Sequence, residues 1–420
     1  MRLLAIGTHG DVLPLLAIGA ELRHRGHAVT FAAPAPFAAS AAQADLAFHP
    51  LGTVADYDDA INAPDLWRPW RGARRVFGFA DSLVAATYRW LAAGHAADGG
   101  VVVASTLGLG ARVAQDALAL PLVMVHAVPV VMESRHAPPR LPGLPLPRIL
   151  PPSLRHRIGR AADRFVIGPA ALPGLNAFRD TLGLPPVRRL RHWWNLAPTL
   201  ILMFPRWYAP PQPDWPAHAV QVGFPVADRF GDAAELPPEL DAFLRAGPPP
   251  LVFTYGSGMR QGRPFFETAR RICARMGRRG VLLAPQPGQV PPDLPADVIH
   301  VPYAPLTALL PHAAALIHHG GIGTVALGLG AGVPQLVVPV AFNHFDEARR
   351  LEALGVGASL SRRRFTPARG TRVLERLLSD PRVAAACRSA RRTARADDGV
   401  GDACDAIERA GRGLQLERAR

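Results

Sequence analysis

Apolar and polar residues alternate in blocks along the chain. Short apolar runs, such as 3–6 and 101–105, are followed by longer stretches with helical spacing, such as 14–25 and 109–118. Short apolar runs favour buried strands and helical spacing favours amphipathic helices, so the alternation predicts parallel sheets with crossover helices. Further strands are expected at 28–32, 121–126, 199–204 and 220–222, whereas 133–152 is rich in proline and predicted to be irregular.

A stretch rich in proline and glycine, 223–238, interrupts this pattern, which then begins again. Strands are expected at 251–254, 281–284, 315–317 and 335–338, with helices at 265–276, 324–330 and 346–354. A chain of 420 residues also exceeds what one hydrophobic core usually holds. We therefore predict an α/β protein with two doubly wound, Rossmann-like domains that face a central cleft: residues 1–222, a linker 223–238, and 239–420 with C-terminal helices.

Composition and charge exclude several classes of protein. All 47 basic residues are arginine, so neither a Schiff-base lysine nor a Walker-A phosphate loop is present. The three cysteines, Cys273, Cys387 and Cys404, are isolated, which excludes a disulfide framework and favours a reducing compartment. No segment has the pattern of a signal peptide or a membrane span, so we expect a cytoplasmic protein.

The formal charge of +14 is unevenly spread in the first half of the chain. Residues 134–206 hold twelve arginines against Asp163 and Asp180, which gives this segment a net charge of +10. Because arginine and tryptophan are common at membrane interfaces, we expect the segment, with Trp193, Trp194 and Trp207, to contact anionic lipid on the inner face of the membrane. The alternative is that these arginines are simply solvated and the tryptophans belong to the core.

Two glycine-containing motifs follow predicted strands. The first spans residues 7–14, GTHGDVLP, and places Asp11 near the start of a helix, where it could cap the helix or act as a base. The second spans 317–324, IHHGGIGT, and is typical of a phosphate-binding turn, although a turn with one core histidine is the alternative. Adjacent His318 and His319 should point in opposite directions, so they are not expected to share a metal.

Two other segments resemble known catalytic motifs but are interpreted differently. Residues 56–59, DYDD, resemble a D-x-D metal motif but are expected to be acids of a polar loop. Residues 255–258, YGSG, lack the first glycine of a nucleophile elbow, so Ser257 is better interpreted as a donor to phosphate or sugar.

Together with 254–257, 303–305 and 331–334, the two motifs resemble the glycosyltransferases of family 1, which have the GT-B fold, over nearly the whole chain. The resemblance implies that Asp11 is the general base and that His319 contacts the donor diphosphate. It also implies a donor-binding set, in which the Tyr303 ring stacks on the base and the Ala304 backbone binds it: Gly256, Ser257, Tyr303, Ala304, His319, Gly321, Gly323, Thr324, Asn343 and His344. Residues expected on the acceptor side are His9, Gly10, His126, Arg135 and His136.

The chain departs from the family pattern at one place. Asn343 and His344 stand where the family commonly has Asp-Gln, which holds hydroxyls of the donor sugar, and Glu347 stands where Asn is usual. Within the family, segments 134–139, 204–216 and 253–259 resemble the rhamnosyltransferase B-chain of rhamnolipid synthesis.

The resemblance implies an inverting glycosyltransferase that works without metal or cofactor. We expect it to move a hexose, with L-rhamnose favoured, from a nucleotide diphosphate sugar to a hydroxyl of a lipid-like or other small hydrophobic acceptor. The alternatives are a glucosyltransferase for a sterol, polyketide or flavonoid-like molecule, a non-hydrolysing nucleotide-sugar epimerase, and a non-catalytic sugar-nucleotide binder. Nucleic acid is not an expected partner, because no recognised binding module accompanies the positive charge.

Overall fold

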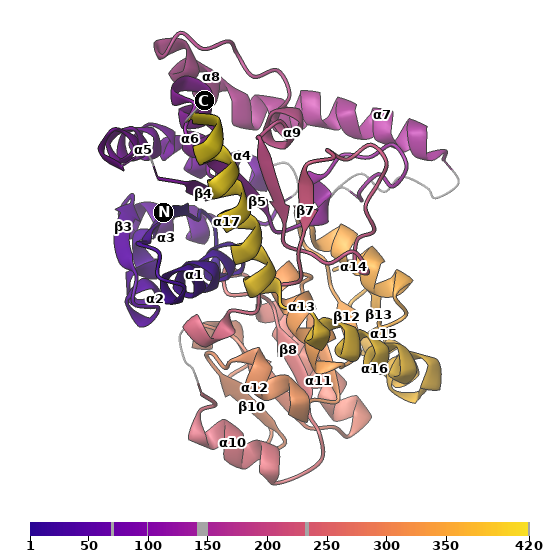
Figure 1. Cartoon of the computed structure of the whole chain (residues 1–420). Coiled ribbons are helices and arrows are strands. Elements are labelled where there is room, and N and C mark those ends of the chain that lie inside the picture. Colours follow the sequence, from indigo (N-terminus) through magenta and orange to yellow (C-terminus); the bar gives the residue numbers. More distant parts are fainter. Residues whose placement is uncertain (69–70, 99, 141–149, 232–234, 419–420) are drawn as a thin grey trace. The chain divides into compact units, whose positions relative to one another are not determined.

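The computed structural model describes residues 1–68, 71–98, 100–140, 150–231 and 235–418. The chain forms two compact units, Met1–Pro225 with Asp398–Arg420, and Val226–Asp397. Figure 1 follows the chain through both of them. Each unit is described by itself.

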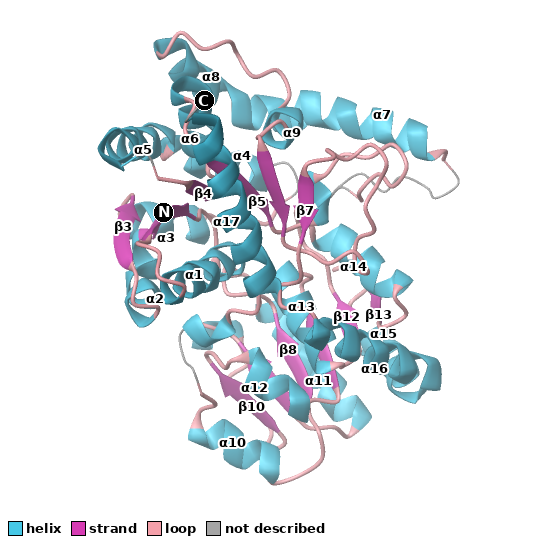
Figure 2. Cartoon of the chain, viewed as in Figure 1, coloured by secondary structure: helices cyan, strands magenta, loops and turns pink. Residues whose placement is uncertain are grey.

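The first unit is built on a parallel sheet of seven strands in the order β3-β2-β1-β4-β5-β6-β7. The strands are β1 (Arg2–Leu4), β2 (Thr30–Pro34), β3 (Ala47–Leu51), β4 (Val102–Ser105), β5 (Leu122–His126), β6 (Thr199–Leu202) and β7 (Ala219–Gln221). Its helices are α1 (His9–His24), α2 (Ala38–Gln43), α3 (Val54–Asn62), α4 (Arg71–Ser82), α5 (Val84–Asp98), α6 (Leu109–Leu118), α7 (Pro152–Ala162), α8 (Gly168–Thr181), α9 (Leu190–Asn195) and α17 (Gly399–Arg418). Figure 2 shows the alternation of strands and helices that the apolar pattern predicts.

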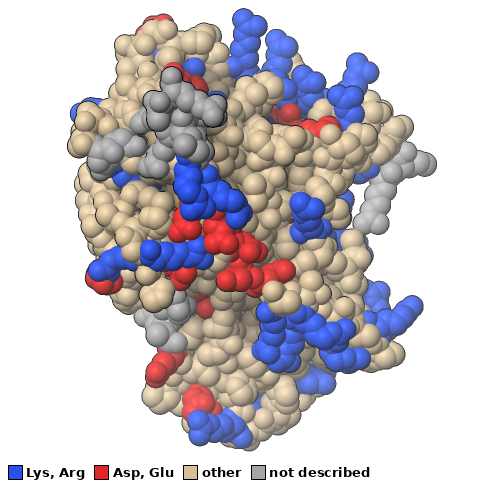
Figure 3. Space-filling view, in the orientation of Figure 1, with Lys and Arg blue, Asp and Glu red and all other residues tan. Residues whose placement is uncertain are grey.

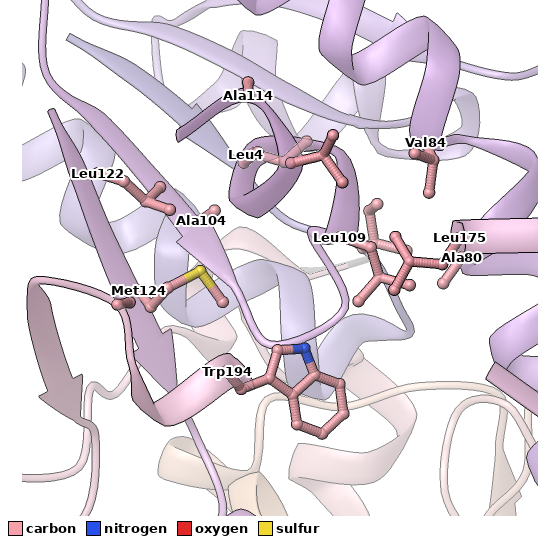
Figure 4. Close-up of a cluster of buried hydrophobic side chains, with 14 of the residues drawn as sticks. Leu4, Ala80, Val84, Ala104, Leu109, Ala114, Leu122, Met124, Leu175 and Trp194 are labelled. Carbon is pink, nitrogen blue, oxygen red and sulfur yellow. The ribbon is translucent and has the colours of Figure 1, made fainter. Parts of the chain in front are cut away.

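The core of this unit lies between the sheet and its helices. Leu4, Ala104 and Met124 belong to one cluster of buried side chains that also includes Trp194 (Figure 4). Trp193 is buried as well, and its indole N–H donates to Asp116 Oδ2 at 2.8 Å. The expectation that these two tryptophans face lipid is therefore wrong, because their large apolar surfaces fill the core instead.

The second unit has a parallel sheet of six strands in the order β10-β9-β8-β11-β12-β13. The strands are β8 (Leu251–Thr254), β9 (Gly280–Leu283), β10 (Val298–Val301), β11 (Ala315–His318), β12 (Gln335–Val337) and β13 (Gly357–Ser359). Its helices are α10 (Pro238–Arg245), α11 (Arg263–Met276), α12 (Leu306–Leu309), α13 (Ile322–Ala331), α14 (His344–Ala353), α15 (Pro367–Ser379) and α16 (Pro381–Ala396).

The C-terminal segment belongs to a different unit from the one expected from the sequence. Residues 398–420, expected in the second domain, belong to the first unit, where α17 packs against α1. Arg25 contacts Asp405 at 2.6 Å and His27 contacts Glu408 at 2.8 Å. The two units divide between residues 225 and 226, within the predicted linker 223–238, of which 232–234 lie outside the described residues.

Several local expectations need correction. Helix α1 begins at His9 rather than at 14, because Thr8 caps it, and Pro14 lies inside it. Residues 56–59 are part of α3, not a loop. Strand β3 was not expected, since Ala47–Leu51 contains a histidine and a proline and lacks a simple apolar run. Within the predicted irregular stretch 133–152, residues 141–149 lie outside the described part of the chain.

Candidate active site

In each unit, the motifs lie where the strand order reverses direction. In the first sheet, β1 lies between β2 and β4, and the turn that follows β1 carries Asp11. In the second sheet, β8 lies between β9 and β11, and the turns after β8 and β11 carry Ser257 and His319. Open α/β sheets bind ligands at the carboxyl ends of the strands at such switch points. Both motifs are therefore at positions suited to binding.

The Asp11 carboxylate is held by the loop that precedes α1. Its Oδ2 atom accepts hydrogen bonds from the Thr8 backbone N–H at 2.9 Å and from the Thr8 hydroxyl at 3.3 Å. Gly7 has φ +138°, and a Cβ there would lie 2.3 Å from this same oxygen. A glycine at position 7 thus allows the carboxylate to fold back over the turn. Asp11 does cap the helix, as the third residue of a capping box.

A second capping box in the chain shows what is different about Asp11. At the start of α3, Asp56 accepts the same two hydrogen bonds from Thr53, at 2.8 and 2.7 Å. Asp56 is exposed, and these bonds hold the pKa of its carboxyl below the ordinary value. For Asp11, burial outweighs the bonds from Thr8 and raises the pKa of the carboxyl. A raised carboxyl pKa is typical of a catalytic base, so Asp11 has a property that capping does not require.

The other predicted acceptor-side residues are not brought together into one group. His9 is half-buried with its ring edge-to-face against Phe37, at 5.1 Å between centroids, and Gly10 is exposed. His126 is fully buried at the end of β5, where its Nδ1 lies 2.9 Å from the Thr106 hydroxyl, and burial lowers the pKa of its imidazole to about 4. Arg135 and His136 are both exposed on the loop that follows β5.

In the second unit, His319 occupies a space that two glycines leave open. Its side chain is 8% exposed. A Cβ at Gly256 would lie 2.8 Å from its Nε2, and a Cβ at Gly321 would lie 2.6 Å from the same atom. Helix α13 begins one residue after Gly321, so the imidazole lies beside a helix N-terminus, where backbone N–H groups favour anions. Thr324 is in the first turn of this helix and is half-buried, as is Gly323.

The rings of His318 and His319 are perpendicular, with centroids 6.3 Å apart. His318 Nδ1 accepts a hydrogen bond from the Gly320 backbone at 3.1 Å. The imidazole pKa is lowered by burial to about 3 for His318 and about 4 for His319, so both rings are neutral at pH 7. No group of His, Cys, Asp or Glu in the described residues is arranged to hold a metal ion.

Sequence analysis missed the contact between His344 and His319. The two rings meet edge-to-face at 4.7 Å, and His344 is 4% exposed. Asn343 donates to the Glu347 carboxylate at 3.2 Å, and Glu347 is fully buried. The three positions at which the resemblance implies other residues, 343, 344 and 347, thus all lie at the start of α14. In the sequence, the only signal for this contact was that residues 343, 344 and 347 all differ from the Asp-Gln and Asn that the resemblance implies.

Tyr303 is held by a residue from the segment that precedes α10. Its hydroxyl donates to the Asp228 carbonyl at 3.1 Å, and a Cβ at Gly231 would lie 1.9 Å from that hydroxyl. The Asp228 carboxylate accepts from the Thr307 backbone at 2.8 Å. Ala304, the next residue, is buried. Asp228 is distant in sequence from the Tyr303 motif, so sequence reasoning could not connect them.

The turn after β8 is also braced by a residue outside the motif. Arg260 donates to the Ser257 carbonyl at 2.9 Å, and the Ser257 side chain is half-buried. Because Arg260 bonds to the backbone carbonyl, this contact does not occupy the Ser257 hydroxyl.

Comparisons with known proteins bear on the family and the fold of the chain. A model of the Glycosyltransferase family 28 N-terminal domain matches residues 1–135. A model of the C-terminal domain of erythromycin biosynthesis protein CIII-like proteins matches residues 282–400. The chain is 30% identical to O-mycaminosyltylonolide 6-deoxyallosyltransferase of Streptomyces fradiae, over 97% of this chain and 96% of the relative. It is also 30% identical to vancomycin aglycone glucosyltransferase of Amycolatopsis orientalis, over 84% of each.

Solved structures show the same fold. The glycotransferase of kitacinnamycin matches with a TM-score of 0.73 at 23% identity, over 98% of each chain. The spinosyn rhamnosyltransferase SpnG, complexed with thymidine diphosphate, matches with a TM-score of 0.64 at 19% identity, over 96% of this chain and 98% of that chain. The protein is therefore a glycosyltransferase with the GT-B fold. More narrowly, the chain belongs to the family of glycosyltransferases that combine the family 28 and the erythromycin CIII-like domains.

Proposed function

We propose that this glycosyltransferase moves a hexose, with inversion and without a metal ion, from a nucleotide diphosphate sugar to a hydroxyl of a hydrophobic natural-product acceptor. The observation that supports donor binding is the position of His319. Its buried side chain lies between Gly256 and Gly321, beside the N-terminus of α13. Backbone N–H groups and an imidazole can stabilise the charge of a departing diphosphate, which supports a reaction that needs no metal.

Asp11 is proposed as the general base. Its carboxylate takes the proton of the acceptor hydroxyl while the oxygen attacks the anomeric carbon, on the side opposite to the diphosphate. The bond between this carbon and the diphosphate oxygen breaks, and the electron pair leaves with the diphosphate. Both hydrogen bonds from Thr8 reach Oδ2, so Oδ1 is the oxygen proposed to take the proton.

The acceptor is proposed from the relatives. Two of them are named for a mycaminosyltylonolide and a vancomycin aglycone, which favours a polyketide-like or peptide-like natural product. The thymidine diphosphate in the SpnG structure favours a dTDP-sugar as donor. A rhamnosyl transfer to a hydroxy fatty acid is the second candidate, supported by the resemblance of 134–139, 204–216 and 253–259 to the rhamnolipid enzyme.

A matrix of donors and acceptors tests the function. The purified protein is incubated with dTDP-L-rhamnose, dTDP-glucose or UDP-glucose, each with macrolactone aglycones, glycopeptide aglycones or hydroxy fatty acids, and products are identified by mass spectrometry. The anomeric coupling in the product reports inversion, and a chelator tests metal dependence. Conversion of a donor without any acceptor would instead support the epimerase alternative, and binding without any product would support a non-catalytic binder.

We expect Asn343, His344 and Glu347 together to disfavour glucose. A neutral Asn accepts fewer hydrogen bonds from sugar hydroxyls than a carboxylate does. Asp alone at 343 would face the buried Glu347 carboxylate, which now accepts from the Asn343 amide, so the two negative charges would repel. The triple variant Asn343→Asp, His344→Gln, Glu347→Asn should therefore shift donor choice towards glucose, while the double variant without the change at 347 should lose stability.

Competition between UDP-glucose and dTDP-rhamnose, with thermal melting of each variant, checks this expectation. A clear preference of the unaltered protein for UDP-glucose would contradict it.

Peripheral membrane contact is proposed for α7 and for the π-helical segment that follows it, Asp163–Ile167. Of the large hydrophobic side chains here, Phe165 is 72% exposed and Leu154 41% exposed, and no residue of α7 is buried. Arg157, Arg160 and Arg164 are exposed on the same stretch, and basic side chains gather where α7 lies (Figure 3). Each arginine near an anionic surface contributes about 1 kcal/mol, which supports reversible attachment. No helix among the described residues is long and apolar enough to cross a bilayer.

Sedimentation with anionic liposomes tests this contact. We expect pelleting at low salt, release at high salt, and loss of pelleting when Arg157, Arg160, Arg164 and Arg188 are changed to Gln. The matched control changes four exposed arginines of the second unit to Gln: Arg363, Arg364, Arg369 and Arg372. Equal loss in both variants would show only a general effect of net charge, and absence of pelleting at low salt would refute the contact.

A further inference from the structure

The positive charge of the second unit is concentrated in one segment. Residues 226–397 hold 22 arginines and 14 acidic residues, but 361–396 alone hold 11 of these arginines and only two of the acids. The rest of the unit, with 11 arginines and 12 acids, is therefore close to neutral. All 11 arginines of the segment are exposed, and basic side chains gather where α15 and α16 lie (Figure 3). An arginine-rich composition alone would spread the charge over the unit, so its concentration points to a role.

The first three of these arginines, which we call the basic turn (362–364), lie at the carboxyl end of the sheet. The strand pairing places four residues in one row across β8, β11, β12 and β13: Thr254, His318, Val337 and Ser359. The chain leaves β13 at this row and reaches the basic turn three residues later. Because β13 is two strands from β11 and neighbouring strands are about 4.8 Å apart, the turn begins about 10 Å from the motif around His318.

An aromatic stack holds the basic turn beside the residues that follow β8. The Phe365 ring stacks on the Phe265 ring, with centroids 5.2 Å apart, and Phe265 stacks on Tyr255 at 4.2 Å. Tyr255 in turn meets the His319 ring edge-to-face, with centroids 6.5 Å apart. The residue that directly follows the basic turn is therefore connected by packed rings to the candidate donor site.

The basic turn has a fixed backbone and unpaired charges. The Ser361 carbonyl accepts hydrogen bonds from the backbone N–H groups of Arg364 and Phe365, at 2.8 and 3.0 Å, which closes the turn. Within the described part of the chain, no carboxylate forms an ion pair with its three guanidinium groups. Burial raises the pKa of the Tyr255 phenol to about 12, and the charge of Arg362 counteracts part of this rise. The positive charge of the turn thus reaches the side chains after β8.

From this geometry we propose that the basic turn attracts the anionic donor to the N-terminus of α13 by long-range charge. The inference rests on the proposed function. A nucleotide diphosphate sugar carries two negative charges, and three positive charges about 10 Å away favour its binding even without direct contact. These arginines act through their charge and are not catalytic residues. Their contribution should weaken with salt, because exposed charges at this distance are screened.

The arginines of α16 provide a matched control. A Cβ at Gly332 would lie 2.9 Å from the Arg391 Cβ, and Gly332 caps the C-terminal end of α13. Helix α13 has ten residues and is about 15 Å long, so this part of α16 lies at the end of α13 that faces away from the donor. That distance exceeds the Debye length of about 10 Å at 0.1 M salt. Arg388, Arg392 and Arg395 of α16 are exposed and allow the same change of charge.

Calorimetry of the full-length protein with dTDP-glucose and with UDP-glucose tests the proposal. At about 0.1 M salt, we expect the triple variant Arg362→Gln, Arg363→Gln, Arg364→Gln to bind about fivefold more weakly than the unaltered protein. At about 1 M salt, where the Debye length is about 3 Å, the two proteins should bind almost equally. The control variant, with the same change at 388, 392 and 395, should lose less than about twofold at either salt concentration.

Two further measurements separate long-range charge from other causes. Lysine at all three positions of the basic turn keeps the charge without the guanidinium fork, so this variant should retain most of the affinity. Thymidine, which lacks phosphate, should bind the glutamine variant and the unaltered protein equally. If the lysine variant binds as weakly as the glutamine variant, or if thymidine binding also falls, attraction by long-range charge is wrong.

The remaining outcomes distinguish this inference from the function on which it rests. Equal weakening in the control variant would show a general effect of net charge and overturn the assignment to the basic turn. Unchanged binding by the glutamine variant at about 0.1 M salt would overturn the proposal but leave the proposed function intact. Failure of the folded, unaltered protein to bind either nucleotide sugar would instead contradict the proposed function.

Discussion

Asp11→Asn is expected to leave folding and donor binding intact and to slow glycosyl transfer by about 100- to 10,000-fold, the range for removal of a general base. The amide can still accept the hydrogen bond from the Thr8 backbone, so the turn after β1 should keep its shape. What the variant loses is the ability to take a proton. Transfer rates at saturating donor and acceptor, with melting temperatures, check the expectation.

Asp56→Asn is a matched control, because Asp56 occupies an equivalent capping box at the start of α3. The lowered pKa of Asp56 means that its ionised form stabilises the fold above the pH at which the unfolded carboxyl titrates, and that this contribution is lost as pH falls. Asp56→Asn should therefore lose some stability and no activity.

Asp11 should change the stability of the fold with pH in the direction opposite to that of Asp56. Its raised pKa means that the ionised carboxyl is less favourable in the folded than in the unfolded protein, so stability is lost as pH rises through the range in which Asp11 ionises. Removing the charge should therefore maintain or increase stability at neutral pH. Near-normal transfer by Asp11→Asn at matched stability would show that capping is its only role.

The raised pKa of Asp11 should also appear in the pH–rate profile of the unaltered enzyme. The pKa that governs the acid limb of this profile should be higher than that of an ordinary aspartate.

His319→Ala is expected to weaken binding of the free nucleoside diphosphate and to slow transfer by about 100- to 1,000-fold, as for the loss of one preorganised donor. The ring lies against Gly256 and Gly321 beside the start of α13, so its removal empties the space next to the proposed diphosphate. Calorimetry with dTDP and UDP measures the binding, and transfer assays measure the rate.

His318→Ala should affect the fold instead. The change leaves the Gly320 N–H without its acceptor and opens a cavity at a fully buried position, which together should cost about 2–4 kcal/mol of unfolding free energy. Chemical denaturation of both variants separates the two effects. If His318→Ala weakens diphosphate binding more than His319→Ala does, the roles assigned to the two histidines are reversed.

The amino-acid sequence alone was enough to predict the class of fold and the two glycine-containing motifs. Apolar runs predict most of the strands, because a parallel sheet covered on both faces needs continuous apolar segments. The motif around His319 could be recognised because glycines, adjacent histidines and a following helix are all local in sequence. The same holds for Asp11 and Thr8, three residues apart, although the start of α1 was placed too late.

Contacts between residues that are far apart in the chain could not be predicted and became visible in the folded protein. The contact between His344 and His319, the bond from Tyr303 to Asp228, and the packing of α17 on α1 all join segments distant in the chain. The burial that raises the pKa of Asp11, while the same hydrogen bonds lower that of Asp56, also comes from surrounding elements. Local patterns specify hydrogen bonds between near neighbours, whereas desolvation depends on everything that packs around a group, and this is why the chemistry of the site required the fold.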